Sequence, residues 1–334
     1  MKILVTGGAG FIGSHTSVEL LNAGYDIVIV DNYSNSNPDV IDKIKKITGK
    51  DFKNYELDVC DKKALEKVFE ENKIDGVIHF AGYKAVGEST QKPIMYYRNN
   101  LDSTLTLLEV MEKYNCKKFV FSSSATVYGK SETLPINEEC PLTTTNPYGT
   151  TKLVNEYILN DLYKSDNSWG IVILRYFNPI GAHESGLLGE NPKDIPNNLM
   201  PYIVRVATGQ YDKLHVFGND YDTVDGTGVR DYIHVVDLSI GHIKALDKLT
   251  KTNGLFTYNL GTGHGVSVLE LVNTFSKVNN VDVKYDITDR RPGDIDACYA
   301  DATKAYEELG FKATKTVEDM CKDSYNFVLK KKNN

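Results

Sequence analysis

The stretch Ile3-Leu4-Val5-Thr6-Gly7-Gly8-Ala9-Gly10-Phe11-Ile12-Gly13 joins a short apolar run to a glycine-rich turn. Residues 3–6 predict a buried strand, and residues 14–22 predict a helix that follows the turn at once. Three of the glycines have the G-x-G-x-x-G spacing. This spacing allows a tight turn and a close approach of the backbone to a pyrophosphate, which the free N–H groups of the helix N-terminus can bind. The stretch therefore predicts the first strand–turn–helix unit of a dinucleotide-binding sheet.

The next apolar run indicates which dinucleotide is bound. Residues 27–30 predict a second strand, which ends in Asp31, 18 residues past Gly13. A carboxylate at this place can accept a hydrogen bond from the adenosine ribose 2′-OH, and it would repel a 2′-phosphate. No Lys or Arg follows until Lys43. These features favour NAD over NADP.

Strands and helices alternate along the first half of the chain at the spacing of a parallel sheet. The further predicted strands are residues 52–57, 76–82 with a turn, 119–122 and 171–176, and the predicted helices are residues 40–47, 62–71, 94–114 and a helix from Tyr148 onward. Small or polar residues stand at or just past the strand ends, namely Asp31, Asp58, Gly82, Ser124 and Asn178. Because ligands bind outside the carboxyl ends of parallel strands, these residues should share one edge of the sheet.

The sequence thus predicts an α/β fold, a doubly wound parallel sheet (Rossmann) with a smaller mixed α/β C-terminal substrate lobe. The regular alternation ends after Asn178, where four prolines and several glycines separate shorter apolar runs. We expect residues 1–177 to form the NAD-binding domain and residues 178–334 mainly the lobe that binds substrate. Some later segments, near residues 232–236 and 256–260, are expected to return to the first domain.

A candidate general base lies in Tyr148-Gly149-Thr150-Thr151-Lys152. Residues four apart on a helix share a face, so the Lys152 ammonium can lie beside the Tyr148 hydroxyl. A phenol with a pKa of about 10 is a poor base at neutral pH, and each unit of lowering requires about 1.36 kcal/mol. A cation within about 4–6 Å can lower the Tyr148 pKa by about one to three units. Tyr148 could then take a proton from a substrate alcohol, to which Ser124 also offers its hydroxyl.

Composition excludes several other classes of protein. The chain has 334 residues, 41% of them hydrophobic, and a net charge of −7, which gives no basic footprint for nucleic acid. No apolar run reaches the length of about 20 residues that a membrane helix needs. Five cysteines without a C-x-x-C pair, and a first strand too early for a secretory signal, predict reduced thiols and a cytoplasmic location. The histidines lack a metal-ligand spacing, so no metal is expected.

Taken together, these residues resemble the extended short-chain dehydrogenase/reductase family, and within it the members that act on UDP-sugars. The resemblance covers nearly the whole chain. It rests on residues 6–15 and 122–129, on Tyr148 to Lys152, and on the blocks His79-Phe80-Ala81-Gly82-Tyr83-Lys84-Ala85-Val86-Gly87-Glu88-Ser89, Leu174-Arg175-Tyr176-Phe177-Asn178-Pro179, Gly228-Val229-Arg230-Asp231-Tyr232-Ile233-His234-Val235 and Arg290-Arg291-Pro292-Gly293-Asp294. Ile180 follows Asn178-Pro179 where the family more often has Thr or Val.

The resemblance implies a set of site residues. Catalysis would fall to Tyr148, Lys152 and Ser124. The NAD site would comprise Gly7, Gly10, Phe11, Ile12, Gly13, Asp31, Asn32, Asn35, Asp58, Val59, Phe80, Ala81, Gly82, Lys84, Asn99, Tyr148, Lys152 and Phe177. The UDP-sugar would contact Lys84, Ser124, Tyr148, Asn178, Asn198, Leu199, Arg230, Arg291, Asp294 and Cys298.

The resemblance also implies a reaction. Tightly bound NAD would accept a hydride from C4 of UDP-galactose or UDP-glucose and return it to the opposite face, with Tyr148 as the base. Cys298 stands where members restricted to these two sugars tend to carry Tyr, so UDP-GlcNAc and UDP-GalNAc are expected substrates too. A homodimer through residues 94–114 and 148–163 is also expected.

Two other functions remain possible at this point. A nucleotide-sugar 4,6-dehydratase would have the same fold, but it uses an Asp-Glu pair where this chain has Ala125-Thr126. A non-catalytic NAD-sensing regulator would commonly lack the Tyr–Lys pair, which is intact here. Conversion of UDP-galactose to UDP-glucose without added reductant separates the three functions.

Overall fold

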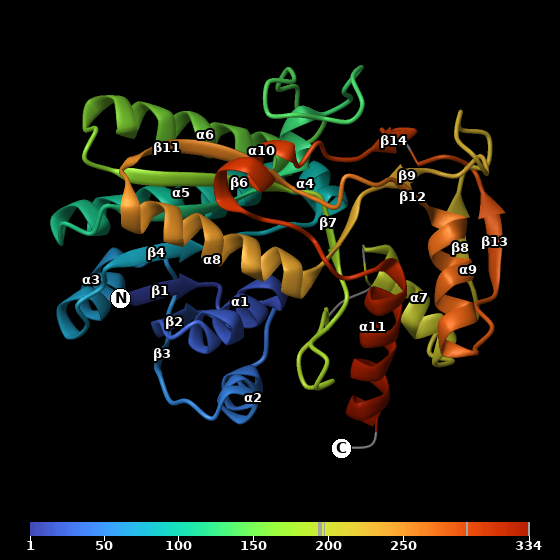
Figure 1. Ribbon diagram of the computed structural model, residues 1–334, viewed down its shortest axis with the longest axis horizontal. Coiled ribbons are helices and arrows are strands. Elements are labelled where there is room, and N and C mark those ends of the chain that lie inside the picture. Colours follow the sequence, from blue (N-terminus) through green and yellow to red (C-terminus); the bar gives the residue numbers. More distant parts are fainter. Residues whose placement is uncertain (193–195, 197, 292, 333–334) are drawn as a thin grey trace.

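The core of the protein is a seven-stranded parallel sheet (Figure 1). The computed structural model describes residues 1–192, 196, 198–291 and 293–332. In spatial order the strands are β11 (Gly254–Leu260), β6 (Gly170–Tyr176), β5 (Lys118–Ser124), β4 (Gly76–His79), β1 (Lys2–Thr6), β2 (Asp26–Asp31) and β3 (Lys53–Glu56). Every neighbouring pair is parallel, which confirms the doubly wound α/β fold expected from the sequence.

Helices cover both faces of the sheet, because successive strand residues point to opposite faces and both faces are apolar. Ile3 and Val5 pack into one hydrophobic cluster, and Leu4 packs into the other. The first face carries α1 (Phe11–Asn22), α2 (Asp39–Thr48), α8 (Val235–Lys251) and α10 (Thr303–Leu309). The second face carries α3 (Lys62–Glu71), α5 (Pro93–Lys113) and α6 (Pro147–Ser165).

The chain returns to the sheet late in the sequence. β11 pairs with β6 along its whole length, from Gly254 opposite Gly170 to Leu260 opposite Tyr176. The preceding helix α8 packs against α1, and both contribute side chains to the same cluster. The sheet therefore includes a strand that follows residue 178 by more than seventy positions in the chain.

A separate hydrophobic cluster forms a C-terminal lobe, at the right of Figure 1. It packs α7 (Leu199–Ala207), α9 (Val268–Asn279) and α11 (Val317–Lys332) around the two-stranded parallel sheet of β8 (Leu214–Phe217) and β13 (Tyr285–Thr288). Two short elements pack within the main domain: α4 (Val86–Gln91) lies against α5 and α6, and the 3₁₀ turn η1 (Ala125–Tyr128) lies against α6. The remaining short strands form two small sheets, one of β7 (Asn178–Ile180) and β10 (Tyr232–His234), the other of β9 (Val229–Arg230), β12 (Val266–Ser267) and β14 (Ala297–Cys298).

The start of α6 is fixed by its own sequence. The Asn146 side chain caps the helix by accepting a hydrogen bond from the Gly149 N–H at 2.9 Å. Pro147 occupies the first helical turn, where its missing N–H costs no hydrogen bond and its φ already suits a helix. These two residues place Tyr148 in the first turn, with Lys152 one turn later. Among the described residues, no helix is both long enough and apolar enough to cross a membrane.

Candidate active site

The turn between β1 and α1 leaves no room for side chains at Gly7 and Gly13. A Cβ atom at Gly13 would lie 2.2 Å from the Gly7 carbonyl oxygen, and a Cβ at Gly7 would lie 2.8 Å from the Ala81 nitrogen. Gly7 also has a φ of +68°, a conformation that other residues adopt at a cost. The turn therefore forms an open backbone cradle, with the N-terminus of α1 directed at whatever occupies it.

Asp31 is fixed beside this cradle at the end of β2. One carboxylate oxygen accepts a hydrogen bond from the Ala9 N–H at 2.9 Å. The other accepts from the Tyr33 N–H at 2.9 Å and the Ser36 hydroxyl at 2.8 Å. A carboxylate has about four acceptor positions, so one remains for a ribose hydroxyl. This arrangement fits the dinucleotide that the sequence predicts.

One cleft of about 1340 Å³ runs from the glycine turn to the C-terminal lobe. Every residue that the sequence analysis assigned to NAD lines it, as do all those assigned to the substrate except Leu199. Leu199 begins α7 and packs against the hydrophobic cluster of the lobe. Asn198, the residue before it, does line the cleft.

Tyr148, Ser124 and Lys152 meet at the centre of the cleft. Tyr148 is hydrogen bonded to Ser124, which lowers the Tyr148 pKa, but burial has the larger effect and raises that pKa to about 12. The Lys152 ammonium lies 5.9 Å from the centre of the Tyr148 ring and donates a hydrogen bond to the Ser122 carbonyl at 2.6 Å. Lys152 is itself buried, and its pKa is lowered to about 8. Glu156, one turn further along α6, acts in the opposite direction and raises the Lys152 pKa.

This geometry corrects one expectation from the sequence. Lys152 was expected to bring the Tyr148 pKa below its ordinary value, but within the protein alone that pKa is raised. The physical reason is that the same burial disfavours both charged forms, the phenolate and the ammonium. Within the protein alone, Tyr148 is therefore a neutral phenol at neutral pH.

At the far end of the cleft, two arginines converge on one carboxylate. Arg230 Nη2 lies 2.6 Å from one Asp294 oxygen, and Arg291 Nη2 lies 3.0 Å from the other. Arg291 also lies over the ring of Phe217, 4.8 Å from its centre. Two guanidinium groups share one carboxylate, so the group keeps a net positive charge that suits a phosphate.

Glu190 connects the two sides of the cleft, and sequence reasoning missed it. One Glu190 oxygen accepts hydrogen bonds from Lys84 Nζ at 2.8 Å and from Asn198 Nδ2 at 2.7 Å. Its other oxygen is buried and has no hydrogen-bond partner in the described structure. Glu190 stands in the irregular segment after β7, where no periodicity marks a single residue, so only its contacts identify it.

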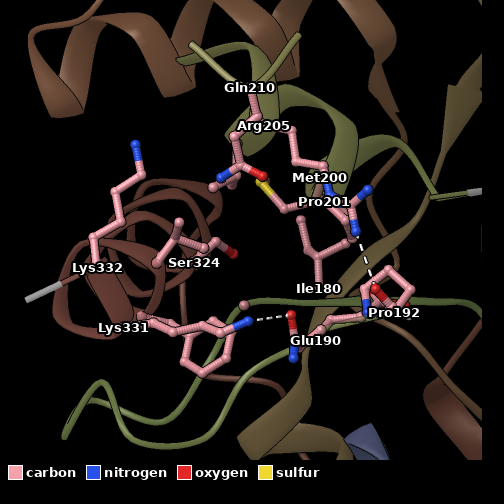
Figure 2. Close-up of a pocket in the computed structure, with 15 residues that line it drawn as sticks. Ile180, Glu190, Pro192, Met200, Pro201, Arg205, Gln210, Ser324, Lys331 and Lys332 are labelled. Carbon is pink, nitrogen blue, oxygen red and sulfur yellow. Dashed lines mark hydrogen bonds between the residues drawn. The ribbon is translucent and has the colours of Figure 1, made fainter. Parts of the chain in front are cut away.

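Next to Glu190 lies a smaller cavity of about 490 Å³ between α7 and α11 (Figure 2). Its apolar wall includes Ile180 and Met200, and Lys331 and Lys332 project from α11 beside it. Glu190 and Lys331 line both this cavity and the main cleft. The cavity is therefore a side branch of the same site.

Two further residues support the centre of the site without having been predicted. The Tyr176 hydroxyl, at the end of β6, donates a hydrogen bond to the Ser122 hydroxyl. Both residues line the cleft. Ser122 stands in the quoted run of three serines, but nothing in the sequence indicates that its carbonyl binds Lys152. Ala125 and Thr126 follow Ser124 in η1, so no carboxylate stands at these two positions.

The lowered pKa of Lys152 predicts a pH-dependent stability. In the folded protein its pKa is about 8, below the value of 10.5 for a free lysine side chain. Between these values the unfolded chain binds more protons, so the free energy of unfolding should rise with pH. At lower pH the folded protein carries a buried ammonium at a cost of up to about 3 kcal/mol.

We therefore expect the free energy of unfolding of Lys152→Met to exceed that of wild type most at about pH 7. This difference should largely disappear by about pH 10. Urea unfolding of both proteins at the two pH values measures the difference. Lys92→Met, at an exposed lysine, serves as the control. Its free energy of unfolding should differ from that of wild type by the same amount at both pH values. A constant difference for Lys152→Met as well would contradict the lowered pKa.

Comparison with known proteins agrees with this site. The GDP-mannose 4,6 dehydratase family matches residues 4–324. The UDP-glucose 4-epimerase of Bacillus subtilis is 60% identical over 327 residues, which cover 98% of this chain and 96% of that protein. The crystal structure of UDP-glucose 4-epimerase from Bifidobacterium longum in complex with NAD+ and UDP superposes with a TM-score of 0.97 at 59% identity, covering 100% and 99% of the two chains.

A more distant structure, the UDP-Glc/GlcNAc 4-epimerase of Campylobacter jejuni, has a TM-score of 0.86 at 37% identity, and covers 98% of this chain and 99% of that one. The family model bears the name of a dehydratase, whereas the similar full-length proteins are epimerases and this chain has Ala125-Thr126 beside Ser124. Since both sequence and structure match over nearly the whole length, this chain belongs to the UDP-glucose 4-epimerase family of extended short-chain dehydrogenases/reductases.

Proposed function

We propose that this chain is an isomerase that interconverts UDP-galactose and UDP-glucose by oxidation and re-reduction at C4 of the sugar. The proposal rests on one cleft that is lined, from one end to the other, by the glycine turn, the Tyr148–Ser124–Lys152 group and the Arg230–Arg291 pair. A dinucleotide, an alcohol and a diphosphate are the ligands that these three groups suit.

NAD fits the first part of the cleft, because the glycine turn leaves backbone space and Asp31 keeps an acceptor beside it. When bound, NAD supplies a hydride acceptor and donor at the sugar C4. In this proposal, residues 1–177 hold the cofactor, and the returning segment of α8 and β11 completes their domain. The remainder of residues 178–334 holds mainly the UDP-sugar.

Tyr148 is the proposed base for the sugar 4-hydroxyl. Lowering its pKa from about 12 to about 7 requires roughly 7 kcal/mol of preference for the phenolate. The Lys152 ammonium supplies part of this, and its hydrogen bond to Ser122 keeps it close to the ring. The positive charge of an oxidised nicotinamide in the same dry cleft adds to the effect. Ser124 holds the substrate hydroxyl and Tyr148 in hydrogen-bonding contact.

Arg230, Arg291 and Asp294 are proposed to hold the diphosphate of UDP. Asp294 keeps both guanidinium groups in place. A diphosphate would offer them further hydrogen-bond acceptors and the negative charge that one carboxylate does not supply. This end of the substrate stays fixed while the oxidised sugar turns. Hydride can then return to the opposite face of C4, which inverts the configuration.

The function is tested by incubating the purified protein with UDP-galactose, without reductant or added cofactor. We expect UDP-glucose to form, and NAD to be released when the protein is denatured. Formation of a 4-keto-6-deoxy sugar would instead indicate a dehydratase. Binding of NAD with no turnover would indicate a sensor.

Tyr148→Phe is expected to retain fold and NAD but to lose turnover by about 10²–10⁴-fold, because only the proton acceptor is removed. Tyr163→Phe, on the same helix but away from the cleft, is the matched control and should keep wild-type turnover. The rate of UDP-glucose formation from UDP-galactose measures both. If Tyr148→Phe kept more than about a tenth of the rate, Tyr148 would not be the base.

Cys298 supports the proposal that the N-acetyl sugars UDP-GlcNAc and UDP-GalNAc are also substrates. It lines the cleft in β14, directly opposite Arg230 of β9. A cysteine there leaves space that an N-acetyl group at C2 needs as the sugar turns. The Campylobacter jejuni structure similar to this chain is named for both UDP-Glc and UDP-GlcNAc.

We expect Cys298→Tyr to reduce UDP-GlcNAc epimerisation about tenfold or more, since overpacking costs about 1–3 kcal/mol. The same variant should keep most of its UDP-galactose activity, and Cys298→Ala should keep both. Assays with the two substrate pairs give the comparison. Absence of N-acetyl activity in the wild type, or no change in the Tyr variant, would rule out this role of Cys298.

A homodimer through α5 and α6 is proposed, because these helices pack side by side and leave apolar side chains uncovered. Leu105 on α5 and Tyr157 on α6 are both exposed. Light scattering at micromolar protein should give the mass of two 37.3-kDa chains. Leu105→Glu should lower that mass, whereas Leu329→Glu, at an exposed leucine of α11, should not. A monomeric wild type would refute the dimer.

A cytoplasmic location is proposed from the cysteines. All five are free thiols, and oxidising compartments favour disulfides. Recovery of the native protein in a secreted or membrane fraction of the source cells would contradict it.

A further inference from the structure

Helix α6 carries a third ionisable residue in the same row as Tyr148 and Lys152. Glu156 follows Lys152 by four residues, as Lys152 follows Tyr148, so consecutive members of the row lie on neighbouring turns of one helix face. Glu156 is buried, with 5% of its side chain exposed, and it does not line the cleft. No step of the proposed reaction uses it, although a buried carboxylate is costly unless it is paired.

The partner of Glu156 is Arg175 of β6, which is also buried. Arg175 Nη2 lies 2.6 Å from Glu156 Oε2, and Arg175 Nε lies 3.0 Å from Glu156 Oε1. Arg175 uses Nη1 in another direction, toward the Tyr128 hydroxyl at 3.0 Å. The pair therefore connects α6, β6 and η1 inside the protein.

Glu156 also binds the strand that carries the catalytic serine. Its Oε1 accepts a hydrogen bond from the Ser123 hydroxyl at 2.5 Å. Side chains alternate along a strand, so Ser123 points away from Ser122 and Ser124. The Ser122 carbonyl receives the Lys152 hydrogen bond, and Ser124 is hydrogen bonded to Tyr148. One carboxylate thus fixes the strand segment that sets the positions of Lys152 and Tyr148.

The charge of Glu156 has a second effect, on Lys152. Among the described residues, the ionisable groups that interact with Lys152 are Glu156 and Tyr148 on α6 and His79 on β4. On β6, Tyr176 interacts with Tyr148, and Arg175 pairs with Glu156. His79 is uncharged at neutral pH, because burial lowers its pKa to about 3. The two tyrosines are neutral phenols in the protein alone, since burial raises the pKa of each. Glu156 is the negative charge in this set, and it acts to raise the Lys152 pKa.

We propose that Glu156 is a positioning residue for the proposed epimerisation, which fixes β5 against α6 and whose negative charge keeps Lys152 in its ammonium form. This rests on the function proposed above. Arg175 neutralises the far side of the carboxylate and prevents Glu156 from remaining an unpaired buried charge.

The proposal is tested with Glu156→Gln in the full-length enzyme with its cofactor. Loss of a nearby negative charge lowers the pKa of both Lys152 and Tyr148. We expect both limbs of the profile of kcat against pH to move to lower pH by about one unit, with little change in KM. In the protein without substrate, the pH at which Lys152 is half-modified by reductive methylation, followed by mass spectrometry, should fall by a similar amount.

Two control variants separate charge from shape. Glu156→Asp keeps the charge, so its profile should stay in place even if its thermal midpoint falls. Asp161→Asn removes an exposed carboxylate from the same helix and should leave the profile unchanged. If Glu156→Gln does not fold because Arg175 is left unpaired, Glu156→Gln combined with Arg175→Met removes both charges of the buried pair, and Arg175→Met alone is its reference.

The proposal would be overturned if kcat fell equally at every pH, while the limbs of its pH profile and the pH of half-modification of Lys152 stayed the same. Glu156 would then be a purely structural residue. This outcome differs from failure of the proposed function. If the wild type does not epimerise UDP-galactose, the methylation of Lys152 still reports whether Glu156 controls its charge.

Discussion

The close contact between Gly7 and Gly13 is the constraint on which the cofactor half of the cleft depends. With a Cβ position at residue 13 only 2.2 Å from the Gly7 carbonyl, any side chain would push α1 away from β1. The helix N-terminus could then no longer reach the turn, and Ala9 would no longer donate to Asp31. The carboxyl ends of the parallel strands lie at one edge of the sheet, and small or polar residues such as Asp31, Ser124 and Asn178 stand at or just past them.

A second constraint is the burial of Tyr148 and Lys152 away from water. Burial raises the Tyr148 pKa to about 12 and lowers the Lys152 pKa to about 8, so it opposes both charges that the proposed chemistry needs. The same low polarity strengthens every charge that is present, because screening by water is reduced. In the protein alone, Tyr148 is therefore a neutral phenol at neutral pH.

The two halves of the cleft are joined by polar contacts rather than by a continuous apolar core. Lys84 and Asn198 both donate to the same oxygen of Glu190, and Asp294 binds arginines from separate segments. Such contacts involve partly exposed groups and can be exchanged for contacts with a charged ligand at modest cost. The sheet therefore positions Tyr148, Ser124 and Lys152, while the polar groups at the other end of the cleft are held by contacts that a charged ligand can replace.

The sequence by itself determined the fold class, the glycine turn and the placing of Tyr148 and Lys152 on one helix. These depend on local spacing: a strand followed by glycines and a helix, acidic and small residues at strand ends, and Tyr148 four residues before Lys152. Only the tertiary structure decided that Leu199 faces the core of the C-terminal lobe, that Glu190 bridges Lys84 and Asn198, and that β11 completes the sheet. It also decided how deeply Tyr148 is buried, which spacing does not report and which raises the Tyr148 pKa. Spacing reports which residues share a helix face or strand end, whereas pKa values and pairs such as Glu156 with Arg175 depend on burial and on neighbours far away in the chain.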